Sequence, residues 1–257
     1  MTTEFTSIAA LLAGIYLAVA AFLDFYQRRL IYVPVPHDAQ FAADELRIDN
    51  QGTRLHGWVL NPGQRSAVIY FGGNSEMISE RREYFEDVFR DYSVYLFNYR
   101  GYGNSEGRPT EVGLFSDALA IYDRIERQHQ SIIAYGRSLG SGVAVHLAAE
   151  RRLDKLILLT PYDSIAAVGQ QSYPVFPVYL LIRDRFDSAA RAGEIRVPVM
   201  IAAAGRDRVI RRPRTLALKQ AFRDAPLTYL SIAGAAHDDI VEFSEYREAV
   251  SRFLRRG

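Results

Sequence analysis

Cysteine is absent from this chain of 257 residues, and its charges nearly cancel, with a formal net charge of +1. The lack of cysteine excludes disulfides, thiolate chemistry and cysteine-ligated metal sites, and it leaves the compartment open. A net charge so close to zero gives no support for a nucleic-acid partner or a strongly charged substrate. The five histidines contain no H-x-x-x-H pair, so we expect no metal site.

No lysine or arginine precedes the long apolar run, which covers 19 uncharged residues from Phe5 to Leu23. As a helix this run would be about 28 Å long, close to the thickness of a bilayer core. We favour a single membrane anchor. A cleaved signal peptide, for which Ala18–Ala20 resembles a cleavage site, and a buried or interfacial helix stay open. For an anchor, Arg28 and Arg29 after the run place the C-terminal part on the cytoplasmic side.

Internal repeats and low-complexity tracts are also missing, and 49% of the residues are hydrophobic, enough for one sizeable core. Val33–Pro36 forms a stiff extended connector. It divides an anchor and connector, residues 1–36, from a single folded domain, residues 37–257. Glu45–Asp49 and Leu55–Leu60 alternate like two antiparallel strands around the turn Asn50–Gly52.

Strand and helix patterns alternate after this hairpin. Short apolar runs, typical of strands buried on both faces of a parallel sheet, occur at 67–71, 94–97, 132–135, 156–159, 199–203 and 227–231. Helical patterns occur near 81–89, 114–127, 142–150, 214–222 and 245–254. The alternation predicts a doubly wound α/β sheet with flanking helices.

Residues 164–194 interrupt this alternation as an insertion between two strands. They contain the apolar stretch Tyr173–Ile182. One interpretation is a small cap or lid whose apolar face binds an acyl chain. The other is an ordinary buried helix that begins at a proline, and an apolar stripe alone does not distinguish the two.

A nucleophile elbow is predicted where an apolar strand meets the following helix around Ser138. Gly136 and Gly140 lack the Cβ atoms that would clash in a sharp turn, and the Ser138 Oγ would lie at the helix N-terminus. This pattern makes acyl transfer the leading hypothesis. The same G-x-S-x-G pattern recurs around Ser105, but Arg108–Pro109 follow where a helix is required, so we interpret that stretch as a loop.

A base and an acid for this serine should follow late strands, because ligands bind at the carboxyl ends of parallel strands. Asp207 follows the fifth apolar run and His237 follows the sixth. The order serine, acid, histidine is the one this topology uses. The imidazole would accept the Ser138 proton, and the carboxylate would hold the imidazole tautomer.

Other side chains compete for these two roles. Asp163 follows the fourth apolar run and stays open as a displaced acid that would keep the triad geometry. Asp238 and Asp239 adjoin His237 and would have to fold back sharply to support it. His146 lies inside the helix after the elbow, where we expect a packed side chain. The remaining histidines lie in the connector, in the early hairpin and at a helix end.

An oxyanion hole needs two backbone N–H groups aimed at the developing alkoxide. One is expected from Leu139, directly after the nucleophile. The other is expected from the loop Gly72–Ser75, where glycines let the backbone approach the substrate closely. A phosphate-binding loop is the rival interpretation, but this segment has neither the Walker pattern nor G-x-G-x-x-G.

These motifs together resemble the α/β-hydrolase superfamily, and more narrowly its membrane-anchored members with one N-terminal helix before a compact catalytic domain. The resemblance extends over nearly the whole chain and rests on Tyr26–Pro34, Phe71–Asn74, Asn98–Gly107, Gly136–Gly140, Gly205–Asp207 and His237–Asp238. It implies the α/β-hydrolase fold, a mostly parallel central sheet with an antiparallel N-terminal hairpin, flanking helices and a short cap.

The resemblance also implies roles for individual residues. It maps the nucleophile, acid and base onto Ser138, Asp207 and His237, and the oxyanion hole onto the N–H groups of Asn74 and Leu139. Relatives usually carry His-Gly-Asn in the first loop, and Gly72 stands in the place of that histidine.

The residues and the resemblance predict a membrane-anchored serine hydrolase that cleaves carboxylic ester or thioester bonds and needs no metal or organic cofactor. The resemblance implies substrates among monoacylglycerols, lysophospholipids, S-acyl proteins and simple esters. We expect contact with a membrane through the N-terminal helix, and the oligomeric state stays open. A peptidase on the same fold and a non-catalytic membrane scaffold are the alternatives.

Overall fold

One β-sheet lies at the centre of the protein in a computed structural model that describes residues 2–36 and 44–255. Within these ranges eight strands lie in the order β1-β2-β4-β3-β5-β6-β7-β8. They are β1 (Asp44–Asn50), β2 (Thr53–Leu60), β3 (Ser66–Phe71), β4 (Tyr92–Phe97), β5 (Ser131–Arg137), β6 (Lys155–Leu159), β7 (Val199–Ala204) and β8 (Leu227–Ile232). The predicted domain boundary after residue 36 lies next to residues 37–43, which are outside the described ranges. His37 is one of these residues.

The N-terminal hairpin is antiparallel, as predicted. β2 pairs antiparallel with both β1 and β4, whereas β4, β3, β5, β6, β7 and β8 pair in parallel. Gln51 and Gly52 join β1 to β2 with positive φ angles of 54° and 76°. Two positive angles are typical of the tight turn whose twist matches that of a hairpin. The mostly parallel sheet with an antiparallel start is confirmed.

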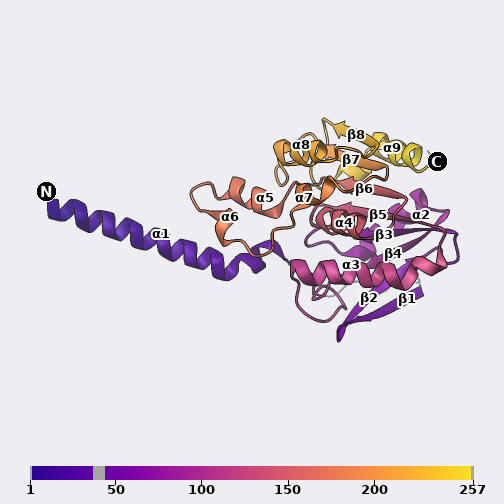
Figure 1. The fold of residues 1–257 in the computed structure, drawn as a ribbon, viewed down its shortest axis with the longest axis horizontal. Helices are drawn as coiled ribbons and strands as arrows, with labels where there is room; N and C mark the ends of the chain where they lie inside the picture. Colours follow the sequence, from indigo (N-terminus) through magenta and orange to yellow (C-terminus); the bar gives the residue numbers. More distant parts are fainter. Residues whose placement is uncertain (1, 37–43, 256–257) are drawn as a thin grey trace.

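Helices cover both faces of the sheet (Figure 1). The described helices of the body are α2 (Arg82–Val88), α3 (Glu111–Ile125), α4 (Leu139–Glu150), α8 (Arg212–Ala221) and α9 (Ser244–Arg255), with short 3₁₀ turns at Ile78–Arg81, Glu126–Gln128 and Ile240–Glu242. Two adjacent residues of β3 show how the side chains divide between the two faces of the sheet. Ile69 packs in the cluster with α3, α4 and α8, and its neighbour Val68 packs in the cluster with α2 and α9. This is why the parallel strands carry apolar side chains on both of their faces.

The carboxyl ends of the parallel strands collect the loops that carry the predicted site. Gly72–Ser75 follows β3, Ser138 follows β5, Asp207 lies after β7 and His237 lies after β8. Parallel strands place all these loops at the same edge of the sheet, close to the point where the strand order reverses around β3.

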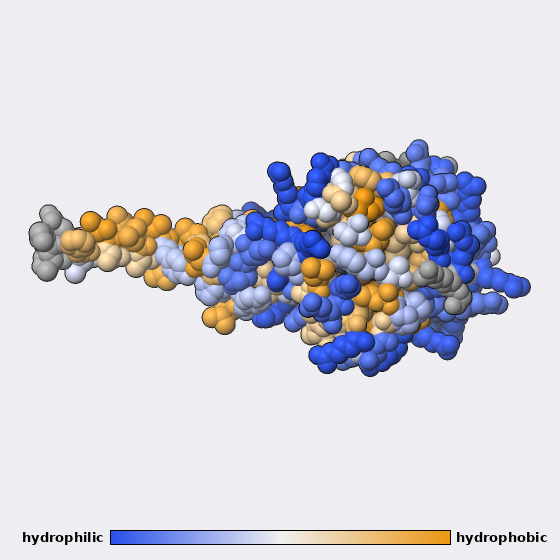
Figure 2. Space-filling model, turned by 90° about the horizontal axis from the view of Figure 1, so that it is seen from above, coloured by the Kyte–Doolittle hydropathy of each residue, from blue (hydrophilic) through white to orange (hydrophobic). Residues whose placement is uncertain are grey.

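The N-terminal helix α1 (Thr2–Ile31) is longer than the predicted apolar run. No helix breaker separates Asp24 from Ile31, and the helix ends at Ile31, three residues before Pro34. By length and composition, Phe5–Ile31 can cross a bilayer, a description that a signal sequence would also fit. Every side chain from Phe5 to Val19 is exposed. Figure 2 shows this apolar helix projecting from a largely hydrophilic body.

Residues 164–194 form α5 (Ile165–Ser172), α6 (Val178–Leu181) and α7 (Ser188–Ala192). α5 and α6 lie beside the C-terminal half of α1 (Figure 1), whereas α7 packs on α4. The interpretation of Tyr173–Ile182 as a buried helix is wrong, because α6 has only four residues and none is buried. Val175 and Leu180 are 70% and 84% exposed. The body of the protein does not cover these two apolar side chains.

His146 is half-buried, and its ring is packed, as expected for a histidine in the helix after the elbow. Its ring stacks on Phe115 with centroids 3.9 Å apart. Among the described residues its Nδ1 has no hydrogen-bond partner. Burial, and then the positive charge of Arg191, lower the pKa of His146 to about 4.

This shift predicts an acid-sensitive contribution to stability. The unfolded chain binds the proton near its ordinary pKa of 6.5, whereas the folded chain resists it down to about 4, so the free energy of unfolding falls across that window as the pH drops. His146→Leu should make the free energy of unfolding depend less steeply on pH in this window. Urea unfolding of both proteins between pH 8 and pH 4 checks it, and parallel curves would contradict it.

Candidate active site

Ser138 lies at the turn between β5 and α4 in a backbone conformation that few residues adopt, with φ 48° and ψ −115°. Two glycines make this turn possible. A Cβ on Gly136 would lie 2.4 Å from the carbonyl oxygen of Gly140, and a Cβ on Gly140 would lie 2.0 Å from that of Phe71. The predicted strand–turn–helix context is therefore present. The helix begins at Leu139, so the serine stands directly at its N-terminus.

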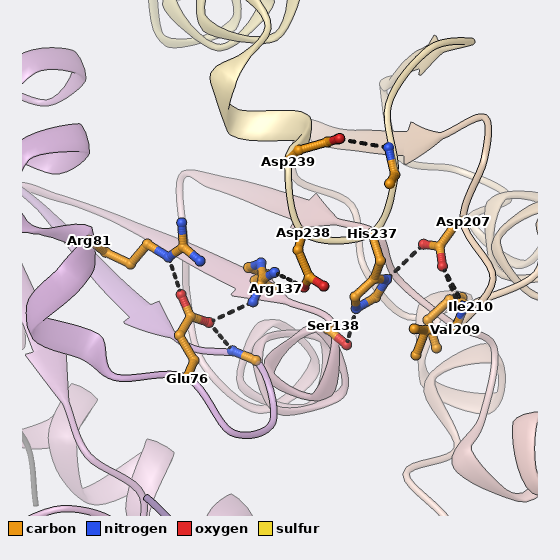
Figure 3. Close-up of polar contacts among 12 residues, drawn as sticks. Glu76, Arg81, Arg137, Ser138, Asp207, Val209, Ile210, His237, Asp238 and Asp239 are labelled. Carbon is orange, nitrogen blue, oxygen red and sulfur yellow. Dashed lines mark hydrogen bonds and ion pairs between the residues drawn. The ribbon is translucent and has the colours of Figure 1, made fainter.

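The three side chains predicted as a triad meet in space (Figure 3). His237 Nε2 lies 2.9 Å from Ser138 Oγ, and His237 Nδ1 lies 2.7 Å from Asp207 Oδ2. The second carboxylate oxygen, Asp207 Oδ1, accepts the backbone N–H groups of Val209 and Ile210, each at 2.8 Å. These bonds fix the carboxylate, which in turn orients the imidazole so that Nε2 faces the hydroxyl.

The serine of the second G-x-S-x-G pattern has a different place. Ser105 Oγ donates to the carbonyl of Asn98 at 2.9 Å and accepts the N–H of His56 at 2.8 Å. It lies in the loop before α3, as the sequence indicates. Both of these hydrogen bonds of the Ser105 hydroxyl are made with backbone groups, and the bond to His56 ties this loop to β2.

The rival acids are engaged by other partners. Asp163 pairs with Arg214 at 3.0 Å. Asp238 pairs with Arg137 at 2.7 Å, and Asp239 accepts a backbone N–H of its own loop at 2.7 Å. Asp207 is the acid that the structure brings to the imidazole.

The two predicted oxyanion donors face the same space. Asn74, Ser138 and Leu139 line one cavity. Leu139 is the first residue of α4, where a helix offers its N–H no acceptor. The N–H of Gly140 donates to the carbonyl of Gly72 at 3.1 Å, which joins the first loop to the elbow.

Side chains hold the first loop although Gly72 replaces the histidine of relatives. Tyr99 donates its hydroxyl to the Gly72 carbonyl at 2.8 Å. The side-chain oxygen of Asn74 accepts both the hydroxyl of Tyr102 and the backbone N–H of Val33, each at 2.8 Å. The connector after α1 is thereby bonded to a predicted oxyanion residue, a link that no sequence pattern indicated.

A buried ion network joins three loops of the site (Figure 3). Arg137 donates to Glu76 at 3.0 Å and to Asp238 at 2.7 Å, and Glu76 also accepts from Arg81 and from the N–H of Gly73. Burial alone would raise the pKa of Glu76, but the two guanidinium groups and the Gly73 N–H outweigh it and hold the pKa below its usual range. No sequence pattern indicated Glu76 or Arg81. A charged residue inside an otherwise apolar elbow, Arg137, was the available signal.

An apolar cavity of about 350 Å³ opens beside Ser138, within the range of ligand pockets. Its apolar lining comes from α1 (Leu23, Leu30, Ile31), from the 164–194 segment (Ile165, Val168, Phe176, Val178, Leu181, Ile182) and from the loop after β7 (Val209, Ile210). The wall formed by α1 was not predicted, because nothing in the pattern of an apolar run shows that it also packs on a domain.

Metal ligation has no candidate in the described ranges, where no group of three or more His, Asp or Glu side chains could hold an ion. The polar groups gathered at Ser138 are instead an imidazole and a carboxylate, and Asn74 and Leu139, the predicted oxyanion residues, line the same cavity. Such groups can move a proton and stabilise an oxyanion.

Comparison with known proteins gives the family. The profile of the Alpha/beta hydrolase family matches residues 55–256. This chain belongs to that family. An uncharacterised protein of Mycobacterium tuberculosis is 34% identical, with 96% of this chain and 94% of that protein aligned. The Alpha/beta hydrolase domain-containing protein WAV2 of Arabidopsis thaliana is 25% identical, with 88% and 86% aligned.

Solved structures of α/β hydrolases share the fold. The esterase Pf2001 of Pyrococcus furiosus superposes with a TM-score of 0.72 at 20% identity, covering 87% of this chain and 99% of the esterase. Est1E of Butyrivibrio proteoclasticus, solved with ferulic acid bound, gives 0.65 at 19% identity and covers 81% and 97%. The predicted α/β-hydrolase fold is confirmed.

We expect the ion network to stabilise the site. Glu76→Gln keeps the shape of the side chain but removes the carboxylate that pairs with Arg81, and it leaves the buried guanidinium of Arg137 with Asp238 alone. The free energy of unfolding should fall by about 3 kcal/mol, measured by urea unfolding.

The matched control is Glu86→Gln, which removes a carboxylate from the half-exposed pair with Arg82. Exposed pairs contribute about 0–1 kcal/mol, so this variant should stay close to the unaltered protein. Equal effects of the two substitutions would contradict a special role for the buried network.

Proposed function

We propose that this protein is a membrane-anchored serine hydrolase that cleaves carboxylic ester or thioester bonds of lipid-like acyl compounds. The observation that carries the proposal is the continuous chain of contacts from Asp207 through His237 to Ser138, at 2.7 and 2.9 Å, beside an apolar cavity. Membership of the Alpha/beta hydrolase family supports it.

The chemistry follows the geometry. Ser138 Oγ attacks the carbonyl carbon while His237 Nε2 takes its proton, and Asp207 stabilises the imidazolium that forms. The N–H groups of Asn74 and Leu139 receive the oxyanion. The protonated imidazole then gives the proton to the leaving alcohol or thiol, and the acyl group stays on Ser138. Water gives a proton to His237 and attacks the acyl-enzyme, and His237 returns that proton to Ser138 Oγ as the acid is released.

The lining of the cavity supports an acyl group rather than a peptide amine. The acidic side chain in its wall is that of Asp24, whose carboxylate bonds Arg183 at 2.7 Å and Gln27 at 3.0 Å. A carboxylate engaged in this way is a poor receptor for a free amine. The remaining wall is largely apolar, which suits a hydrocarbon chain.

The exposed apolar surface of α1 supports membrane attachment. A row of exposed side chains that includes Leu12 and Ile15, at 61% and 52% exposure, has no cover in the described part of the chain. The length of Phe5–Ile31 suits a bilayer. Arg28 and Arg29 near its end favour a body on the cytoplasmic side.

Removal of the nucleophile tests the chemistry. Ser138→Ala should abolish labelling by a fluorophosphonate probe and reduce the turnover of p-nitrophenyl esters by at least about 10³-fold, because the triad acts as a unit. Labelling is read by in-gel fluorescence and turnover by absorbance.

Ser105→Ala is the control, since it alters the other G-x-S-x-G serine and leaves the cavity intact. It should keep both labelling and turnover when circular dichroism shows a folded protein. Undiminished labelling of folded Ser138→Ala would refute the proposal.

Two arginines in the middle of α1 test the attachment. Leu12→Arg with Ile15→Arg should move the protein from the membrane to the soluble fraction, because each arginine costs about 2.5–3.5 kcal/mol at a bilayer centre. Fractionation after a high-salt wash measures this.

Val112→Arg, at a 78% exposed apolar position on α3, is the matched control and should leave the protein in the membrane. A mature protein whose N-terminus follows Ala20 would show instead that the apolar run is a cleaved signal peptide.

A further inference from the structure

One face of α1 forms a wall of the cavity at Ser138. Leu23, Gln27, Leu30 and Ile31 line it. Their spacing of three or four residues puts them in one stripe along the helix. The opposite wall is the hairpin formed by α5 and α6, which contributes Val178 and other apolar side chains. The cavity is therefore a space between α1 and this hairpin, with Ser138 at its inner end.

Polar contacts fix α1 against the hairpin beside this cavity. Gln27 donates to the carbonyl of Leu181 at 3.2 Å and accepts the N–H of Arg183 at 2.7 Å. Arg28 bonds the buried carboxylate of Asp184 at 2.9 Å. Because these groups satisfy one another, the stripe of α1 that faces the cavity presents mainly hydrocarbon. Specific hydrogen bonds and an ion pair therefore hold this wall in place.

The hairpin follows α1 outward into the apolar run. Tyr16 stacks on Phe176 with ring centroids 5.0 Å apart, and its hydroxyl donates to the carbonyl of Val175 at 3.0 Å. Tyr16 lies 15 residues before Ile31, which is about 22 Å along the helix. Phe176 also lines the cavity. The outer end of the cavity thus lies beside the part of α1 that a bilayer would surround.

The tip of the hairpin is itself apolar and exposed. Val175, Tyr179 and Leu180 are 70%, 44% and 84% exposed. Figure 2 shows separate orange patches among blue and pale residues where the helix joins the body. If Phe5–Leu23 spans the membrane, Tyr16 lies in the hydrocarbon region. The tip of the hairpin, which contacts Tyr16, then lies there too, where apolar side chains are stable.

We propose that the substrate is a lipid ester whose acyl chain enters sideways from the bilayer, between α1 and the α5–α6 hairpin, and reaches Ser138 without leaving an apolar environment. This inference rests on the proposed function. The helix then has two roles, since it attaches the protein and binds the acyl chain. A long chain must pass Leu23, whereas an acetyl group reaches Ser138 without contacting it.

A bulky residue on the lining stripe tests this route. The full chain is reconstituted in phosphatidylcholine vesicles, and the hydrolysis of p-nitrophenyl palmitate and p-nitrophenyl acetate is compared. Leu23→Trp should lower kcat/KM for the palmitate ester at least about tenfold, equivalent to about 1.4 kcal/mol. The acetate ester should change less than about twofold. Val178→Trp on the facing wall should give the same selectivity if Leu23→Trp does not fold.

Phe22→Trp is the matched control, because this neighbour of Leu23 is 55% exposed and is not among the residues that line the cavity. It should leave both esters unchanged. Unchanged palmitate hydrolysis in the Leu23 and Val178 variants, or equal loss of both esters, would overturn the lateral route while the esterase chemistry stands. If the unaltered protein cleaves neither ester, the proposed function fails first and the route fails with it.

Discussion

The close approach of Gly140 to the end of β3 is the constraint on which the site depends. Only the missing Cβ lets the elbow come within bonding distance of the Gly72 carbonyl. That contact sets the spacing between Ser138 and the loop that carries Asn74. The ion pairs of Glu76 and Arg137 then hold the same loop from its other side. Rigid placement would matter for the proposed oxyanion hole, because a misplacement of about 1 Å can cost about 10²-fold in rate.

The sheet and the proposed triad were predictable because their signals are local. Apolar runs fix the parallel strands, and the position of a polar residue directly after a strand fixes which edge it reaches. Asp207 and His237 could therefore be placed without any knowledge of their contacts. The elbow glycines could be interpreted for the same reason, since strain at Ser138 is a property of its own turn.

Other features depend on contacts between distant segments, which no local pattern encodes. The bond from Val33 to Asn74 joins residues 41 positions apart. Asp184 meets Arg28 across 156 positions. The exposure of Leu180 likewise could not be inferred from its apolar neighbours, because the same stretch would suit a core helix. α1 was interpreted from its length and composition alone, and its packing on the 164–194 segment followed only from the structure.

The bond between Val33 and Asn74 has a consequence for how this protein can be divided. A shortened protein that begins after the connector would lose one wall of its cavity and one of the two groups that hold the Asn74 side chain. The exposed apolar surface of α1 and the shape of the cavity would change in the same step. In this protein the N-terminal helix and the domain form the wall of one cavity, and the two are best treated as one unit.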